Sequence, residues 1–176
     1  MVGIELEHCL SRYPYTRPVA TPHDRLRDLG IELPSAPPPA ANYVPTRSVP
    51  IGEGRSLVYV AGQIPRKPDG GMYTGRVPSQ VSVEEARAAA RACGVAILAQ
   101  LEAAGGLDRV EQIAQVIGFV NCEAGFGEQP EVVNGCSDLL VDVLGDAGRH
   151  TRAAVGANAL PRDVTVEIAA VAIIKT

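Results

Sequence analysis

The chain has 176 residues, of which 20% are charged and 46% are hydrophobic, a composition typical of one globular domain rather than of a disordered or fibrous chain. Its net charge is −4, and no segment is rich in lysine and arginine, so the composition disfavours a surface that binds nucleic acid through its phosphates. A local basic patch is still compatible with these values.

The four cysteines, Cys9, Cys93, Cys122 and Cys136, include no pair with the C-x-x-C spacing of a metal or redox site. Cys93 and Cys122 fall in helical and strand patterns, which predicts buried free thiols. The first fifteen residues contain acids and a histidine where a signal peptide has a basic segment and an apolar run. The longest apolar stretches are interrupted by Glu167 or by glycines, so no membrane span is predicted. We therefore expect a cytoplasmic protein with reduced cysteines.

Residues 1–32 are predicted to form an N-terminal extension with one short helix. Thr21 can cap this helix, Pro22 suits its first position, and Asp24 completes the spacing of a capping box. The proline-rich run from residue 34 to residue 45 is expected to be extended, because proline fixes φ and biases its predecessor away from the helix. Residues 33–176 are predicted to form a single domain.

The rest of the chain alternates between strand and helix patterns. A hairpin is expected about Gly52-Glu53-Gly54, and an S-x-x-E capping box at Ser82 begins the longer helix. Pro130 suits the start of the next helix. In chain order we predict strands 47–51 and 56–61, a helix from residue 82 to residue 105, strand 113–121, a helix from residue 130 to residue 145, and two strands within 150–174.

The last stretch, residues 150–174, is predicted to form two strands joined by a Leu160-Pro161-Arg162-Asp163 corner. Side chains of the second strand alternate, and both of its faces become apolar towards its end. Two amphipathic helices can cover one face of such a sheet, and no further segment is left to cover the other. A homo-oligomer is the economical solution.

Two charges stand out in this stretch, Arg152 and Glu167, because burying an unpaired charge is costly. They could form an ion pair with each other. Alternatively they could form a ligand site, because a guanidinium suits bidentate binding of a carboxylate and a glutamate can hold a water. The residues alone leave both interpretations open. His150 lies two residues before Arg152, so it would project from the same side of a strand, although a rim or turn position also suits a histidine.

The pair Asn134-Gly135 is unusual inside a helix, since both residues are poor helix formers. Either a close helix crossing or a position of Asn134 near a pocket would explain it, and both remain open. The sequence has no phosphate loop, dinucleotide motif, G-x-S-x-G or H-E-x-x-H. His8 and His23 stand at no metal-ligand spacing to each other or to the cysteines. We therefore expect no metal site.

The segment HTRAAVGANALPRDVTVEIAAVAI resembles the C-terminal signature of the reactive-intermediate deaminase family, also called Rid or YjgF. That signature is an arginine followed by small residues, a Leu-Pro corner and a V-E-I strand. VAGQIP at residues 60–65 is similar to the family's S-G-Q-x-P, and FVN precedes the second helix. LGIELPSAPPPAANYVP resembles the opening of a longer branch, often labelled endoribonuclease L-PSP or chorismate-mutase-like. The resemblance extends from about residue 33 onward.

The resemblance implies an α+β fold, with a mixed β-sheet and two helices packed on one face, assembled as a homotrimer with sites in intersubunit clefts. It also implies a hydrolase that converts enamines and imines to ketones and ammonia without a cofactor, 2-imino acids being the best-known substrates. Carried over to this sequence, Arg152 matches the carboxylate-binding arginine and Glu167 the glutamate that holds the attacking water. Tyr43 matches the pocket tyrosine, and Asn134 is a weaker match to a helix asparagine.

Two positions depart from the family's pattern. Ala154 stands where the deaminases often carry a cysteine, and Ala61 replaces the serine next to Gly62. The backbone carbonyl of Ala154 could still hold a water, so Ala154 and Gly62 are both retained as predicted substrate-binding residues. These departures indicate a differently shaped pocket.

The predicted function is deamination of a small carboxylate-bearing imine, with a small carboxylate metabolite as the ligand and no membrane partner. One alternative is a non-catalytic trimer that binds a 2-oxo acid or a similar metabolite. Another is an endoribonuclease, as the family label says, against which the acidic balance weighs.

Overall fold

A computed structural model describes residues 20–36 and 42–176. The helices of this part are α1 (Pro22–Asp28), α2 (Val83–Gly105) and α3 (Gln129–Leu144), and the strands are β1 (Thr46–Gly52), β2 (Arg55–Gln63), β3 (Val110–Asn121), β4 (Thr151–Ala157) and β5 (Val166–Lys175). The predictions for His8, Cys9, most of the N-terminal extension and the middle of the proline-rich run lie outside the described residues.

The strands form one sheet in the order β1-β2-β5-β3-β4. β3 and β4 are parallel, whereas all other neighbouring pairs are antiparallel. The predicted mixed sheet of an α+β fold is thus confirmed. The two strands at the C-terminal end of the chain are not neighbours, because β3 lies between β4 and β5.

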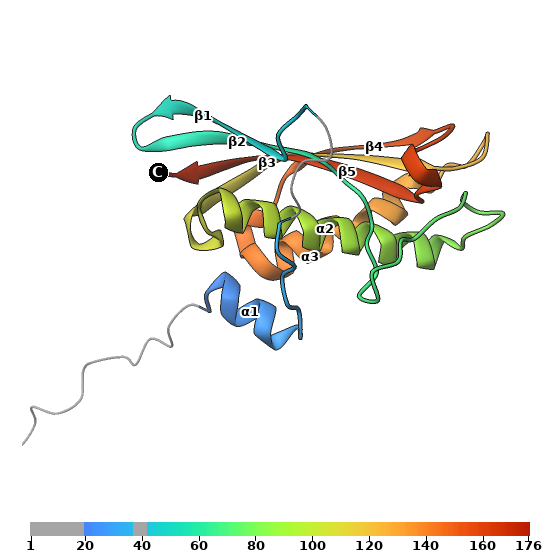
Figure 1. Cartoon of the computed structure of the whole chain (residues 1–176), viewed down its shortest axis with the longest axis horizontal. Helices are drawn as coiled ribbons and strands as arrows, with labels where there is room; N and C mark the ends of the chain where they lie inside the picture. Colours follow the sequence, from blue (N-terminus) through green and yellow to red (C-terminus); the bar gives the residue numbers. More distant parts are fainter. Residues whose placement is uncertain (1–19, 37–41) are drawn as a thin grey trace, which may run out of the picture.

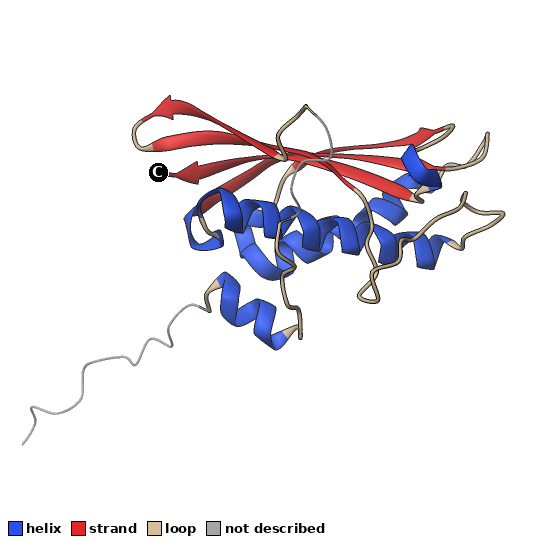
Figure 2. Cartoon of the chain, viewed as in Figure 1, coloured by secondary structure: helices blue, strands red, loops and turns tan. Residues whose placement is uncertain are grey.

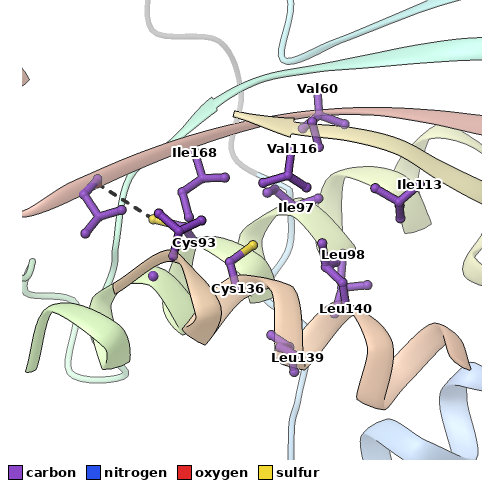
Figure 3. Packing of buried hydrophobic residues seen from close by; sticks show 14 of the residues in the cluster. Val60, Cys93, Ile97, Leu98, Ile113, Val116, Cys136, Leu139, Leu140 and Ile168 are labelled. Atoms are coloured by element: carbon purple, nitrogen blue, oxygen red, sulfur yellow. Dashed lines mark hydrogen bonds between the residues drawn. The ribbon is translucent and has the colours of Figure 1, made fainter. Parts of the chain in front are cut away.

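The helices all lie on one side of the sheet, and α2 and α3 pack directly beneath it (Figures 1 and 2). In β5 the even-numbered residues 166–174 are buried on this side, while Glu167, Ala169, Val171 and Ile173 are half-buried on the other. Figure 3 shows Val116 of β3 and Ile168 of β5 directed at Ile97 and Cys93 of α2. The core is therefore the layer between the sheet and these two helices.

Local sequence signals account for most element boundaries. Thr21 and Asp24 form a reciprocal capping box at α1, and Ser82 and Glu85 form another at α2. The β1–β2 turn has positive φ at its two central residues, 51° at Glu53 and 67° at Gly54. This pattern is characteristic of the two-residue turns that match the twist of a hairpin.

Helices α2 and α3 cross at very short range. A Cβ atom at Gly135 would lie 2.0 Å from the carbonyl oxygen of Arg87, and one at Gly94 would lie 3.4 Å from the Cα of Cys136. Of the two explanations for Asn134-Gly135, the close helix crossing therefore holds for Gly135. The position of α3 under the sheet depends on this contact.

Helix α1 packs on the outside of the helix layer. Leu26 is only 5% exposed and belongs to the main hydrophobic cluster. Arg25 donates from Nη1 to the carbonyl oxygen of Val143 at 3.2 Å, near the end of α3. The predicted short helix is thus present, and the chain around it contributes to the core.

The thiols of Cys93, Cys122 and Cys136 are free and buried, which confirms the prediction made for Cys93 and Cys122. Burial raises the pKa of Cys136 to about 12 and raises the pKa of Cys93 well above its ordinary value. Both groups therefore remain protonated thiols and act as small apolar side chains in the core. No helix of the described chain has the length and apolarity to cross a membrane.

No α-helix of the described residues covers the other face of the sheet (Figure 2). Val49, Tyr59, Phe119 and Val155 are exposed on it, and strand register places half-buried residues such as Val171 between them. An apolar face of this extent usually marks an interface. It is the surface that a homo-oligomer would cover.

Gly135→Ala tests the close crossing of α2 and α3. The alanine should improve helix propensity by about 1 kcal/mol, but its methyl group must displace the α2 backbone, and overpacking of this kind costs about 3 kcal/mol. We expect a net loss of roughly 2 kcal/mol in the free energy of unfolding, measured by urea titration at fixed protein concentration. Gly127→Ala is the control, since nothing lies within 4 Å of its Cβ position. Equal stability of the two variants would refute the close crossing.

Candidate functional site

Arg152 lies on the helix-facing side of β4, at the edge of the sheet. Its register partner in β3 is Val116, which is completely buried beneath the sheet. From Nη1, Arg152 donates to Oδ1 of Asn134 at 2.8 Å and to Oγ of Ser137 at 3.1 Å, both on α3. The side chain remains exposed because β4 is the edge strand of the described sheet. Among the described residues it forms no salt bridge.

His150 extends this group of side chains. Its Nδ1 lies 2.6 Å from the carbonyl oxygen of Gly148, and its Nε2 lies 3.0 Å from Oγ of Ser137. A carbonyl can only accept, so Nδ1 carries a proton, and Nε2 of the neutral ring accepts the hydroxyl proton of Ser137. Burial lowers the pKa of His150; the Gly148 hydrogen bond opposes this shift, and the charge of Arg152 adds to it.

Asn134, Ser137, His150 and Arg152 form one connected set, here called the arginine cluster. Ser137 accepts from Arg152 and donates to His150, so the guanidinium is fixed from two positions on α3. The amide of Asn134 also donates to Glu131 at 3.2 Å. Asn134 thus holds the guanidinium of Arg152, while its neighbour Gly135 permits the close helix crossing.

Glu167 lies on the opposite, open face of the sheet, in β5. Its register partner in β3 is Phe119. A β-bulge between Val60 and Gln63 brings Gly62 alongside, and a Cβ atom at Gly62 would lie 2.0 Å from Oε1 of Glu167. The missing side chain at Gly62 thus makes room for the carboxylate. Gly62, Phe119 and Glu167 are here called the glutamate cluster.

The carboxyl of Glu167 has no salt-bridge partner in the part of the chain that the structure describes. Burial raises its pKa above the ordinary value. A half-buried, unpaired carboxyl is costly for the fold, and a carboxyl whose pKa is raised by burial is a candidate for a functional role.

Tyr43 belongs to the short segment that leads into β1. It is exposed and precedes β1. The carbonyl oxygen of Pro45 accepts from the amide of Ala61 at 2.9 Å, and the segment just before β1 lies on the open side of the sheet (Figure 1). The segment that carries Tyr43 is therefore tied to β2 next to Gly62.

Ala154 lies two residues beyond Arg152 and shares its face. It is half-buried and packs against the hydrophobic cluster, next to Gly118 of β3. No space for a larger ligand group is evident on its core side, since a Cβ at Gly118 would already lie 2.7 Å from Val133. Its contribution to a site would come from its backbone.

The arrangement rules out a mutual ion pair between Arg152 and Glu167 in one chain. The two side chains leave opposite faces of the sheet, and β3 separates their strands by roughly 10 Å. The expectation that both charges sit on buried strands is also wrong for Arg152, which is exposed on an edge strand.

Ser137 and Phe119 are additions that sequence reasoning missed. Ser137 follows Asn134 by three residues, so helical spacing alone places the two on one face of α3. Phe119 follows from the strand pairing of β3 with β5, which no local pattern reveals. Across the described residues, no group of three His, Cys, Asp or Glu side chains could hold a metal ion.

Known proteins share this architecture. A family model described as "YjgF/chorismate_mutase-like, putative endoribonuclease" matches residues 23–172. Protein TCP17 of Trypanosoma cruzi is 43% identical over 145 residues, which are 81% of this chain and 88% of that protein. The structure of protein Atu1372 from Agrobacterium tumefaciens, of unknown function, is 42% identical with a TM-score of 0.76, covering 88% of this chain and 94% of that one.

A more distant structure carries a ligand. E. coli TdcF with bound serine is 27% identical with a TM-score of 0.53, covering 80% of this chain and 94% of that one. The family match spans most of the sequence, and it agrees with the fold and with the resemblance carried by the C-terminal stretch. The chain belongs to the YjgF/chorismate-mutase-like family.

Proposed function

We propose that this protein hydrolyses a small carboxylate-bearing imine, of the 2-imino acid type, to the keto acid and ammonia. The observation that carries this proposal is the state of Arg152, a cation with no salt bridge in the described chain, held by Asn134 and Ser137 at an exposed edge. A fixed guanidinium of this kind suits a substrate carboxylate. The serine bound to TdcF, itself a carboxylate, supports small-molecule binding in this family.

Glu167 is the group that would handle the attacking water. Burial raises its pKa, which makes its carboxylate a stronger base than an exposed one. The water oxygen bonds to the carbon of C=N while the nitrogen gains a proton, giving a carbinolamine. This intermediate then loses its nitrogen as ammonia and forms C=O, so that imine and water yield ketone and ammonia. Orientation of the imine by Arg152 would lower the barrier.

A homotrimer with sites between subunits would bring the two clusters together. Within one chain no small substrate can touch both Arg152 and Glu167, since they lie on opposite faces of the sheet. A neighbouring copy that covers the open apolar face could place its own edge strand beside Glu167. In this arrangement Asn134 and the backbone of Ala154 come from one copy, and Tyr43 and Gly62 from the other.

A binding protein without turnover is the second candidate. The favouring observation is again TdcF, which was solved with a serine. A trimer that holds a 2-oxo acid on Arg152 would use the same cluster. Titration of the protein with a 2-oxo acid, alongside an assay for ammonia release from fresh 2-imino acids, separates the two candidates.

Arg152→Ala tests the carboxylate anchor. Loss of charge-assisted hydrogen bonds costs about 3 kcal/mol, so kcat/KM for 2-imino acids should fall at least about 100-fold. Arg152→Lys should recover only part of this loss, because an ammonium cannot reproduce the planar fork. Ammonia release from 2-imino acids generated in the assay is the measurement. Arg109→Ala, which removes an exposed arginine far from the cluster in sequence, is the control. Unchanged turnover in Arg152→Ala would disprove the mechanism.

Glu167→Gln tests the perturbed carboxyl through stability. Because the pKa of Glu167 is raised in the folded state, the folded chain binds more protons than the unfolded chain just above the ordinary value of 4.5, and stability falls as pH rises. The glutamine variant does not lose stability in this way, because its side chain does not titrate. Its free energy of unfolding should exceed that of the parent by an amount that grows from pH 4 upward and then levels off.

Urea titrations at a series of pH values give this difference directly. Glu32→Gln removes an exposed carboxylate and controls for the change in net charge. A difference between Glu167→Gln and the parent that stayed flat across the series would show that burial does not perturb Glu167.

A further inference from the structure

A shallow recess of about 250 Å³ lies beside the arginine cluster. It is lined by Ser137 and Val141 of α3 and by Arg149, His150 and Arg152 at the start of β4. Its volume falls below the range of roughly 300–1,000 Å³ that whole small-molecule ligands occupy. The recess therefore suits one small chemical group rather than a complete ligand.

The charges around the recess are arranged for an anion. Arg149 and Arg152 flank it, and Asp138, the carboxylate next to Ser137 in sequence, is held away by a 2.6 Å hydrogen bond from Arg87 of α2. Asp146 is the carboxylate that competes, since its Oδ1 lies 3.2 Å from Nε of Arg149. That pair is almost fully solvent-exposed, and exposed pairs contribute little. An incoming anion can therefore replace Asp146.

The two arginines differ in how they are held. Arg152 is fixed through Ser137, whose hydroxyl is in turn oriented by His150. Within residues 20–36 and 42–176, the guanidinium of Arg149 is held only by its exposed contact with Asp146, so it is free to turn. Arg149 precedes β4 and lies outside the regular strand, and both arginines line the same recess. A fixed cation and a movable one around one recess can hold two anionic groups of one molecule.

We infer that the recess binds a second anionic group of the substrate, a carboxylate or a phosphate, between Arg149 and Arg152. This inference rests on the proposed function, in which Arg152 holds the first carboxylate. The substrate class is then an imino acid that carries a second acidic group, rather than a simple 2-imino acid with an apolar side chain. It also gives a role to Arg149, which the deamination mechanism does not use.

A matched pair of product-like acids tests this inference on the full chain. 2-Oxoglutarate has two carboxylates, and 2-oxopentanoate has the same carbon chain with one. Isothermal titration should show 2-oxoglutarate binding at least about tenfold more tightly, and Arg149→Ala should bring the two affinities together. Arg109→Ala, the exposed control, should keep the preference.

Equal binding of the two acids by the parent protein would overturn the inference, and so would equal weakening of both by Arg149→Ala. The proposed function fails differently: binding or turnover would then be insensitive to Arg152→Ala. Arg149 is exposed, so its replacement should leave the unfolding transition unchanged, and a shared loss through misfolding would be visible there.

Competition separates the two kinds of anion. Phosphate and acetate are compared at equal concentration for their displacement of 2-oxoglutarate. Stronger displacement by inorganic phosphate would indicate that the recess binds a phosphate group. The reverse order would assign a carboxylate. A third outcome is that phosphate and acetate both fail to displace 2-oxoglutarate at concentrations at which 2-oxopentanoate still binds. In that case the recess holds no anion, and the inference is wrong.

Discussion

The alternation of side chains across the sheet is the constraint on which the rest of this structure depends. Successive residues of a strand point to opposite faces. The register of β3 with its two neighbours therefore decides on which face of the sheet each charged side chain lies. It places Arg152 against α3 and Glu167 on the open face next to Phe119. Each charge lacks an ionic partner in the described chain, and each has a different environment.

The arginine cluster is a product of helix packing as much as of the strand. α3 can present Asn134 and Ser137 to β4 because Gly135 lets it lie against the α2 backbone at Arg87. His150, held by the carbonyl of Gly148, then orients the Ser137 hydroxyl. A small residue in the core thereby controls the position of a guanidinium on the surface, which links the packing of the fold to the chemistry of the site.

Local features were predictable from the sequence, whereas contacts between residues far apart in the sequence were not. Both capping boxes and the turn at Glu53-Gly54 depend on residues a few positions apart. The sequence left an Arg152–Glu167 ion pair open as one of two interpretations, because nothing local shows that β3 is inserted between β4 and β5. Likewise, the fit of Glu167 against Gly62 depends on a bulge in β2 and on pairing over a hundred residues. The family resemblance implied roles for these residues, but it did not show their separation onto two faces of the sheet.

The proposed site combines Arg152 of one copy with Glu167 of another. Subunit mixing tests this arrangement most directly. Arg152→Ala and Glu167→Gln, each inactive alone, are unfolded together and refolded as a one-to-one mixture. If sites form between copies, each mixed trimer regains one intact site, and ammonia release recovers to about a quarter of the parent's activity. Continued inactivity of the mixture, with mixed trimers shown to be present, would contradict the account.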